Sequence, residues 1–406
     1  MRINNIPLSA TRYILCAYLI VLSISPAFAL GEGARNLLLI AFMGVAPVLL
    51  VIYPVWSRLD ALLLLLSITT IIFPLLGHPE TMRWSTVLYS CMFFMCFMIT
   101  TRLLVVSNID IGRYSNLIKG LIFAYFGVLL IQQCCVLLGL PIFNVSNYDV
   151  TQPWKLNSLM SEPEHSGRVM ALLMFSYLTM QDCIKGRKMT FKESWRRDKP
   201  IWLAFLWSML TMVSAGAYLF LFIVILRYLN RRRLLPIICC IIVLVILGVP
   251  LDIKPIVRVY NIVAAFFTFD INEIYRADQS GALRFIPAII CWREIDLSSL
   301  NGWFGAGVDF VETFLYRYLP GVNEGYTGGG AFQYALEFGI LNFIIYSSFT
   351  FYACYDKQNK SVSILFWVLS VLLGGINVQL TWATIVFLYC NKRFERQKLI
   401  SITSRI

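Results

Sequence analysis

Residues 201–229 decide the fold, and they read IWLAFLWSMLTMVSAGAYLFLFIVILRYL. At 1.5 Å per residue, one helix of these 29 residues would cross a bilayer only with a strong tilt. Basic residues flank the run on both sides, namely Lys185, Arg187, Lys188, Lys192, Arg196, Arg197 and Lys199 before it and Arg231, Arg232 and Arg233 after it. Because Lys and Arg in short loops hold those loops in the cytoplasm, both ends of the run favour the same side. The run therefore predicts a hairpin of two short helices that turns at Ser214-Ala215-Gly216-Ala217, with one long tilted helix as the alternative.

Residues 362–390 form a second apolar run of the same length. Basic residues again lie on both sides, at Lys357 and Lys360 before it and at Lys392, Arg393, Arg396 and Lys398 after it. Gly374-Gly375-Ile376-Asn377 interrupts the run near its middle, so we expect a second hairpin there. Irregular backbone at membrane depth is tolerated only where it is buried in protein or lines a wet cavity. We therefore expect both turns to face a polar interior.

The composition of the whole chain indicates a membrane protein. Of its 406 residues, 59% are hydrophobic and only 14% are charged, which is unlike a soluble domain. Single spans are predicted at 13–30, 37–53, 59–76, 86–106, 117–140, 167–182, 234–250 and 331–353. Together with the two hairpins they predict one integral membrane domain over 1–406, all-α and polytopic, with about twelve membrane helices. Both termini are then cytoplasmic, and two long loops, 141–166 and 251–330, face outward.

The net charge of +12 does not indicate nucleic-acid binding, because the basic residues fall in short loops between apolar runs. The inner loop 183–200 combines this charge with Phe191 and Trp195, which predicts either a contact with anionic lipid headgroups or a plain topology anchor. At the N-terminus, Arg2 and Arg12 precede an apolar stretch and Ala27-Phe28-Ala29. We expect an uncleaved first span there, with a cleaved signal peptide as the alternative.

The cysteines and histidines do not form a metal-binding or disulfide pattern. Nearly all of the eleven cysteines lie inside apolar runs, and Cys291 alone falls in a loop assigned to the outside. The chain has only two histidines, His78 and His165, and it contains no CxxC or Cys/His spacing. We therefore expect no disulfide framework, no metal site and no cofactor.

The segment Ser161-Glu162-Pro163-Glu164-His165-Ser166-Gly167-Arg168 gathers ionisable side chains at the start of a predicted span. A serine cap, an early proline and acids in the first turn also make a good helix start, and this explains Ser-Glu-Pro-Glu without any function. It does not explain His165 and Arg168 at a membrane boundary, where ionisable groups usually mark function. We expect functional roles for Glu162 and His165, while Glu164 fits either interpretation.

A second candidate group is made of arginines in the loop 251–330, at Arg276, Arg284 and Arg293. Residues 284–293 predict a short amphipathic helix at the outer surface. Positions 284 and 293 fall on opposite sides of such a helix, so one arginine points inward and the other outward. Guanidinium groups pair with phosphate oxygens in a planar, bidentate way, which suits a diphosphate headgroup. The alternative is that they pair with lipid headgroups or with Glu294 and Asp296.

Gly302-Trp303-Phe304-Gly305-Ala306-Gly307 follows these arginines. The predicted strand that a dinucleotide-binding fold needs is missing before it, so the motif is weak evidence for phosphate binding. It predicts a tight turn where backbone approaches another segment closely.

Three places carry a likeness to a known superfamily: Ser161-Glu162-Pro163 at a helix start; Arg284 with Trp292 and Gly305-Ala306-Gly307; and Gly328-Gly329-Gly330 with Glu337-Phe338-Gly339. They resemble the bacterial O-antigen and exopolysaccharide polymerases and the related O-antigen ligases. The likeness covers most of the chain by architecture, but each motif is short and degenerate. Ser214-Ala215-Gly216 is similar to the superfamily's Ser-Arg-Gly turn, with Ala215 in place of the arginine. Ligase members carry a histidine before the segment that matches Glu337-Phe338-Gly339, and its absence here favours the polymerases.

The resemblance implies a GT-C-like glycosyltransferase of the bacterial inner membrane with a periplasmic active face. Such an enzyme moves a growing glycan from undecaprenyl diphosphate onto the non-reducing end of a lipid-linked repeat unit, with inversion and without a metal. It also implies a chain-length regulator protein as a partner. An O-antigen ligase is the first alternative, and a flippase for lipid-linked sugar is the second. Transporters usually carry ionisable groups at the bilayer midplane and internal repeats, and neither is visible here.

The chemistry assigns a role to each candidate residue. A leaving diphosphate needs fixed cations, so Arg284 is expected to hold it, with Arg168, Arg276 and Arg293 in support. The acceptor hydroxyl needs a base, and either Glu162 or His165 can serve. Glu164 is the weaker candidate.

Overall fold

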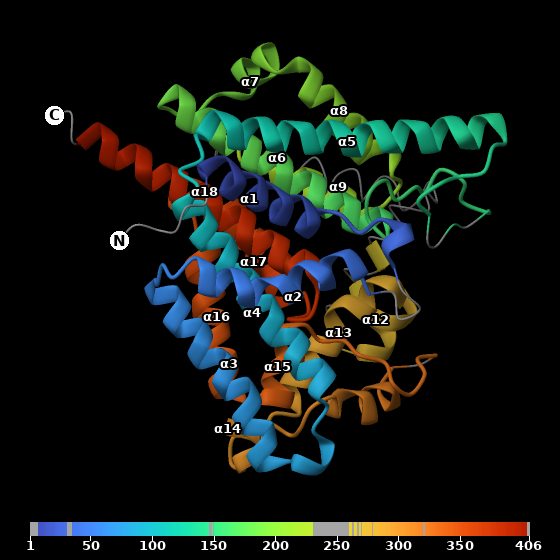
Figure 1. Cartoon of the computed structure of the whole chain (residues 1–406). Coiled ribbons are helices and arrows are strands. Elements are labelled where there is room, and N and C mark those ends of the chain that lie inside the picture. Colours follow the sequence, from blue (N-terminus) through green and yellow to red (C-terminus); the bar gives the residue numbers. More distant parts are fainter. Residues whose placement is uncertain are drawn as a thin grey trace.

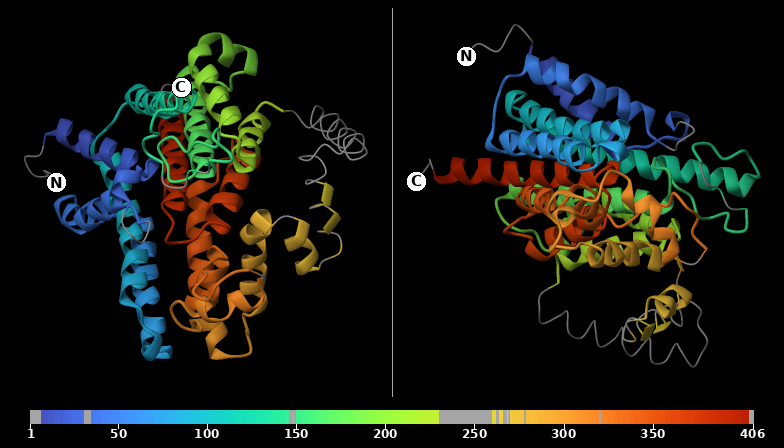
Figure 2. Two further views of the ribbon diagram at one scale, coloured as in Figure 1. Left: turned by 90° about the vertical axis from the view of Figure 1, so that its right-hand side faces the viewer. Right: turned by 90° about the horizontal axis from the view of Figure 1, so that it is seen from below.

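The computed structural model describes residues 7–30, 35–145, 148, 150–229, 260–261, 264–265, 268, 270–277, 279–319 and 321–403. Over these residues the structure is helical, apart from an isolated bridge between Leu30 and Asn36 (Figure 1, Figure 2). The α-helices are α1 (Leu8–Ser23), α2 (Leu37–Ile52), α3 (Arg58–Gly77), α4 (Trp84–Val106), α5 (Ile111–Leu138), α6 (Pro163–Lys185), α7 (Phe191–Arg197), α8 (Lys199–Thr211), α9 (Ala215–Leu226), α12 (Ile271–Ala277), α13 (Gln279–Arg293), α14 (Leu300–Phe304), α15 (Ala331–Phe338), α16 (Ile340–Cys354), α17 (Lys360–Trp367) and α18 (Gln379–Thr403). Shorter pieces are the 3₁₀ turns η1 (Ala27–Ala29), η2 (Pro79–Thr81), η3 (Phe310–Thr313) and η4 (Leu315–Arg317) and the π-turn η5 (Val368–Leu372). The all-α prediction is confirmed.

Among the described residues, three helices, α3, α4 and α5, are long and apolar enough to cross a bilayer. Several large apolar side chains of α3 are exposed, namely Leu64, Leu65, Ile68, Ile72, Leu75 and Leu76. An exposed apolar face of this kind needs lipid around it, because in water it would drive association. The chain is therefore a helical membrane protein. The count of twelve spans stays a prediction, since the other apolar helices are shorter and the predicted span 234–250 lies outside the described residues.

Two predicted spans differ from the observed helices. The helix predicted at 13–30 ends at Ser23. Pro26 disfavours helical backbone at the residue before it. The backbone N–H of Ser25 instead donates to Leu159 O, at 2.9 Å. The span predicted at 331–353 is two helices, α15 and α16, separated at Gly339, whose φ of 91° is helix-breaking. The other predicted spans in the described part each overlap one helix.

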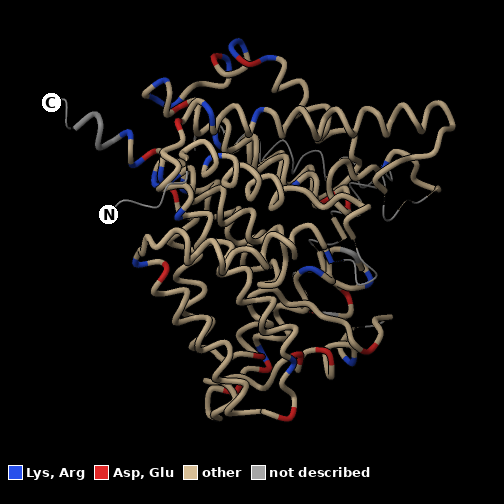
Figure 3. The backbone as a smooth tube through the Cα atoms, viewed as in Figure 1, with Lys and Arg blue, Asp and Glu red and all other residues tan. Residues whose placement is uncertain are grey.

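Helices α1 to α4 alternate in direction between two ends of the bundle, because the start of α1, the end of α2, the start of α3 and the end of α4 meet. At one end, Arg12 of α1 donates to Ser107 O after α4 at 2.9 Å, and Arg102 of α4 donates to Leu50 O of α2, also at 2.9 Å. Arg102 also pairs with Asp60 at the start of α3, at 3.3 Å. We call this the basic end, because Lys and Arg gather there in Figure 3, and both chain termini lie on this side in Figure 1.

The first hairpin is confirmed and the alternative of one tilted helix is wrong. Helices α8 and α9 are separated by residues 212–214, where Val213 has a φ of 47°. Trp202 near the start of α8 and Tyr228 after α9 lie together, with ring centroids 6.0 Å apart. Arg227 pairs with buried Asp182 near the C-terminus of α6, so both ends of the hairpin lie at the basic end. The turn lies slightly earlier than predicted, since Ser214 is the N-cap and Ala215-Gly216-Ala217 already belong to α9.

The second hairpin is confirmed at its predicted turn. Helix α17 and η5 lead away from the basic end, and α18 returns after residues 373–378, which include Gly374-Gly375-Ile376-Asn377. Arg396 of α18 donates to the hydroxyl of Tyr352 near the end of α16, at 3.2 Å, so α18 ends beside the point where α17 begins. Both turns therefore lie at the end of the bundle opposite the basic end.

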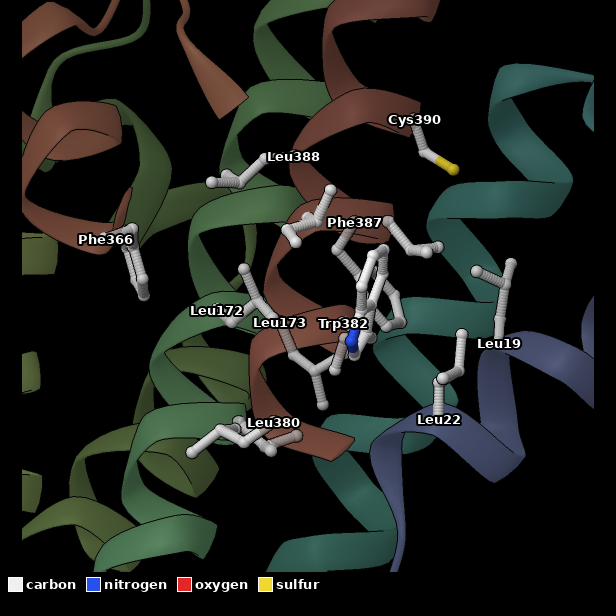
Figure 4. Packing of buried hydrophobic residues seen from close by; sticks show 14 of the residues in the cluster. Leu19, Leu22, Leu172, Leu173, Phe366, Leu380, Trp382, Phe387, Leu388 and Cys390 are labelled. Atoms are coloured by element: carbon white, nitrogen blue, oxygen red, sulfur yellow. The ribbon is translucent and has the colours of Figure 1, made fainter. Parts of the chain in front are cut away.

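The core packs around α18 and α6. Trp382 of α18 is fully buried, lies between leucines of α6 and α1 in Figure 4, and stacks on Phe93 of α4 at 5.8 Å between centroids. Aromatic contacts of this kind add to the stabilisation from burial alone. Helix α9 lies close along α6, because Gly167 leaves room for Ala217; a Cβ at Gly167 would lie 2.7 Å from Ala217 Cα. The start of α6 is thereby fixed between α9 and α18.

Residues 270–338 build a small second core at the end opposite the basic end. It contains Ile286 and Ile290 of α13, Leu315 and Leu336. The predicted close approach of Gly305-Ala306-Gly307 is confirmed, because Ala306 N donates to Leu336 O at 2.9 Å and Gly307 N to Glu337 O at 3.3 Å. Gly305 and Gly307 both have positive φ, at 104° and 109°. The turn thus fixes the C-terminal end of α15 beside α13.

Candidate functional site

The acidic segment at the start of α6 and the arginine helix α13 come together in the structure. Arg284 of α13 and Arg168 of α6 each form an ion pair with Glu164, on different carboxylate oxygens. Arg168 lies one turn after Glu164 on the same helix, whereas Arg284 is far away in sequence. The carboxylate is nearly buried, with 9% of the side chain exposed, while Arg284 keeps 42% exposed. One carboxylate therefore orients two guanidinium groups, which pair with no other carboxylate among the described residues.

A cavity of about 440 Å³ opens beside this pair, and we call it the arginine cavity. Its polar lining is Glu164, Arg168, Arg284, Thr327 and Gln333, with backbone exposed at Gly216, Gly281, Gly328, Gly329, Gly330 and Gly375. The rest is apolar, with Leu219, Phe220, Ile274, Leu283, Phe285, Leu369, Leu373 and Val378. Arg168 Nε is buried and has no hydrogen-bond partner among the described residues. The cavity thus has one cationic wall and one apolar wall.

A second cavity of about 440 Å³ lies next to it, and we call it the amide cavity. Four side-chain amides line it, from Asn36, Gln333, Asn377 and Gln379. Its other polar lining residues are Ser25, Arg35, Arg83, Thr86, Ser161, His165, Asp309, Glu312, Thr327 and Glu337, and its ring-bearing residues are Tyr89, Tyr334 and Phe338. The start of α9, directly after the first hairpin turn, lines the arginine cavity, and the second turn lines both cavities. The expectation that a turn faces a polar interior is thus confirmed for the second turn, whereas residues 212–214 of the first turn line neither cavity.

The two cavities share a wall made by Thr327, Gly330, Gln333, Gly375 and Val378. The segment at the start of α6 lines both cavities. Ser161 and His165 line the amide cavity, and Glu164 and Arg168 line the arginine cavity. Glu164 and Arg168 are four residues apart in α6, so they lie one above the other on one face of the helix. A group held at the arginines can therefore lie within reach of a group in the amide cavity.

The structure does not bring all seven predicted site residues together. Glu164, Arg168 and Arg284 line the arginine cavity, and His165 lines the amide cavity, with Nδ1 at 3.2 Å from Ser161 Oγ. Glu162 is the N-cap of α6 and is exposed, and it lines neither cavity. Arg276 and Arg293 are also exposed and line neither cavity. Of the two arginines of α13, Arg284 reaches Glu164, whereas Arg293 is exposed.

Sequence reasoning missed Glu337 and Gln333 of α15. Glu337 is 2% exposed and accepts hydrogen bonds from Gln333 Nε2 at 3.1 Å and from Val311 N at 3.2 Å. Glu337 lies at the C-terminal end of α15, where its carboxylate meets the backbone of Val311 in the loop 251–330. There burial raises the pKa of the Glu337 carboxyl to about 8, and Asp309 and Glu312 add to the shift. The sequence signal that could have identified them is the spacing of four residues between Gln333 and Glu337, directly before an apolar helix.

The second missed residue group is the amide network of the second hairpin turn. Gln379 at the start of α18 donates to the carbonyls of Val21, Leu22 and Ile24 at 2.8, 3.1 and 2.7 Å. Its Oε1 accepts from Asn36 Nδ2 at 3.1 Å. These contacts join α1 and the N-cap of α2 to the start of α18, and separations above 340 residues leave no local sequence signal.

Comparisons of the chain with protein-family models, with characterised proteins and with solved structures gave no match.

Proposed function

We propose that this protein is a membrane glycan polymerase that moves a growing chain from an isoprenoid diphosphate carrier onto a lipid-linked repeat unit. The observation that carries the proposal is the Arg168–Glu164–Arg284 bridge at the wall of the arginine cavity. It places two guanidinium groups where an anionic headgroup can reach them from an apolar surface. The O-antigen and exopolysaccharide polymerases, which the sequence resembles, use a donor of this class.

The arginine cavity fits the diphosphate of the donor. A diphosphate presents more oxygens than one carboxylate, and the two guanidinium groups offer ten N–H donors between them. Arg168 Nε is one such donor, buried and without a partner among the described residues. In this proposal Glu164 is a positioning residue: it orients both arginines before the donor arrives, and the headgroup then takes over some of its contacts. The apolar lining, which includes Leu219 and Leu373, suits the first isoprene units of the carrier.

The transfer itself follows from these positions. The acceptor hydroxyl oxygen bonds to the anomeric carbon of the donor sugar, and the bond from that carbon to the diphosphate oxygen breaks with its electron pair. The leaving diphosphate gains charge that Arg168 and Arg284 stabilise, which is usually the largest electrostatic contribution in such a reaction. We assign the hydroxyl proton to His165, which lines the amide cavity on the other side of the shared wall. The exposed Glu162 remains the alternative base.

A gene deletion tests this function against its two rivals. A polymerase deletion leaves single repeat units on the lipid carrier, a ligase deletion leaves long chains on it, and a flippase deletion leaves the repeat units on the inner leaflet. Complementation with Arg284→Ala is expected to give no long chains at normal protein level. Arg317→Ala is the matched control, because Arg317 lies in the same long loop, is exposed and lines neither cavity. Normal chain lengths with Arg284→Ala would overturn the proposal.

A further inference from the structure

We propose that the amide cavity is a separate binding site for an uncharged saccharide, the non-reducing end of the acceptor repeat unit. The inference rests on the proposed function, because it assigns the second substrate of that reaction to a second chamber. It is carried by the chemistry of the cavity lining and by the wall that the two cavities share.

In the amide cavity two carboxylates, Asp309 and Glu312, face the one guanidinium group of Arg83, so this part of the lining does not suit a phosphate. Arg83 Nη1 donates to Asp309 Oδ2 at 2.7 Å and to both carboxylate oxygens of Glu312 at 3.1 Å. Thr86 adds a further hydrogen bond to Asp309, at 3.1 Å. Arg35 lies over the ring of Tyr89, at 5.3 Å from the centroid. The arginine cavity differs, because there one carboxylate faces two guanidinium groups.

The amide cavity instead offers hydrogen-bonding groups held in place, which is what sugar hydroxyls need. Asn377 Oδ1 accepts from Ser90 Oγ at 2.6 Å, and its Nδ2 has no partner among the described residues. Gln333 Nε2 donates to Glu337, and its Oε1 likewise has no partner in the part of the chain that the structure describes. A fixed donor and a fixed acceptor can therefore bind a hydroxyl without first reorganising. The rings of Tyr89, Tyr334 and Phe338 add flat apolar surface suited to the C–H face of a pyranose.

The wall that the two cavities share places the bound saccharide next to the donor sugar. Gln333 lines both cavities, so a saccharide bonded to it lies beside the sugar whose diphosphate is held at Arg284. The attacking hydroxyl then comes from the amide cavity, and His165 lines that cavity as the acceptor for its proton. The spent carrier can leave through the apolar side of the arginine cavity while the lengthened chain remains with the acceptor. Two chambers thus keep the two lipid-linked substrates in distinct roles.

The test measures two ligands on the purified full-length protein in nanodiscs. One probe is farnesyl diphosphate, and the other is the oligosaccharide released by mild acid from the surface polysaccharide of the parent strain. We expect Asn377→Ala to weaken oligosaccharide binding by about tenfold, as the loss of one good hydrogen bond implies, and to leave farnesyl diphosphate binding unchanged. Arg284→Ala is expected to weaken farnesyl diphosphate binding and to leave oligosaccharide binding unchanged. Asn301→Ala is the control, because Asn301 is an exposed amide of the same end that bonds to His78 and lines neither cavity.

The outcomes separate this inference from the proposed function. If the wild-type protein does not bind the oligosaccharide, or if Asn377→Ala and Gln333→Ala both bind it normally, the saccharide site is wrong. If farnesyl diphosphate binds equally well to Arg284→Ala, the proposed donor site fails while the saccharide site stands. Oligosaccharide binding by the wild-type protein is measured without any variant. The inference can therefore be rejected even if Asn377→Ala does not fold.

Discussion

Gly216 of α9 lies directly against Glu164 of α6, so closely that a Cβ on Gly216 would overlap Glu164 Cγ. The start of α9, directly after the first hairpin turn, therefore holds the side chain that bridges Arg168 and Arg284. A glycine is needed here for space, since residue 216 lies inside α9 with ordinary helical backbone. The position of the carboxylate depends on how closely α9 approaches α6.

Gly216→Ala is the first test of this relationship. The new methyl group is expected to push Glu164 away from the arginines and to lower polymer formation at least tenfold, with the protein still inserted. Surface-glycan profiling of a complemented deletion strain measures this. Gly127→Ala in α5 is the matched control, because no heavy atom lies within 4 Å of its added Cβ; that change favours the helix and should keep full activity. Equal activity of the two variants would contradict a steric role for Gly216.

The second prediction concerns coupling between Glu164 and Arg284. If Glu164 acts by orienting Arg284, Glu164→Gln is expected to cost activity in the wild-type background and much less in an Arg284→Ala background. A double-mutant cycle on the transfer rate should give a coupling of about 0.5–3 kcal/mol. The same cycle between Glu164 and Arg293 should be additive, because Arg293 lies on the exposed side of α13. Additive effects in the first cycle would show that Glu164 acts independently of Arg284.

The third prediction distinguishes the two candidate bases. His165→Ala is expected to lower the transfer rate by about 10²–10⁴-fold, as removal of a general base does, with little change in donor binding. Glu162→Gln is expected to keep most activity, because Glu162 is exposed and lines neither cavity. Single-turnover assays with lipid-linked substrate compare them. If only Glu162→Gln loses activity, the base is Glu162, at the exposed start of α6, and not His165.

The fourth prediction uses the buried carboxyl of Glu337. Its pKa is raised by burial to about 8 in the folded protein, against an ordinary value of 4.5. Between these values the folded state binds more protons than the unfolded chain, so this group lowers the free energy of unfolding as pH rises from about 4.5 to 8. Glu337→Gln is neutral throughout and should show a smaller fall in melting temperature between pH 5 and pH 9. Identical pH dependence in both proteins would rule out a buried neutral Glu337.

The fifth prediction concerns orientation in the membrane. Alkaline phosphatase fused after Ser298 is expected to be active and a fluorescent protein fused there dark, because residues 270–338 are proposed to face the periplasm. Fusions after Lys188, in the basic loop between α6 and α7, should behave in the opposite way. If the two positions report the same side, the proposed periplasmic site is wrong.

The sequence by itself determined the helical class, most helix positions and both hairpins. These depend on local properties: apolar length, basic flanks, and residues such as Gly374-Gly375 that interrupt a helix. The sequence also placed Arg284 and the start of α6 in one site, because both carry charge on the same predicted side. Its errors of position, at Ser23 and Gly339, came from apolar runs that continue past the residue where backbone geometry ends the helix.

Only the tertiary structure decided which carboxylate meets Arg284. Glu162 and Glu164 are two residues apart, so they project about 200° apart around α6, and nothing local says which one faces α9 and α13. The close contact of Gly167 with Ala217 fixes that choice, since it sets how α9 lies on α6 and leaves Glu164 inside and Glu162 exposed. The amide cavity likewise forms from segments far apart in the chain, such as Asn36 and Gln379, whose contact depends on packing and not on sequence spacing.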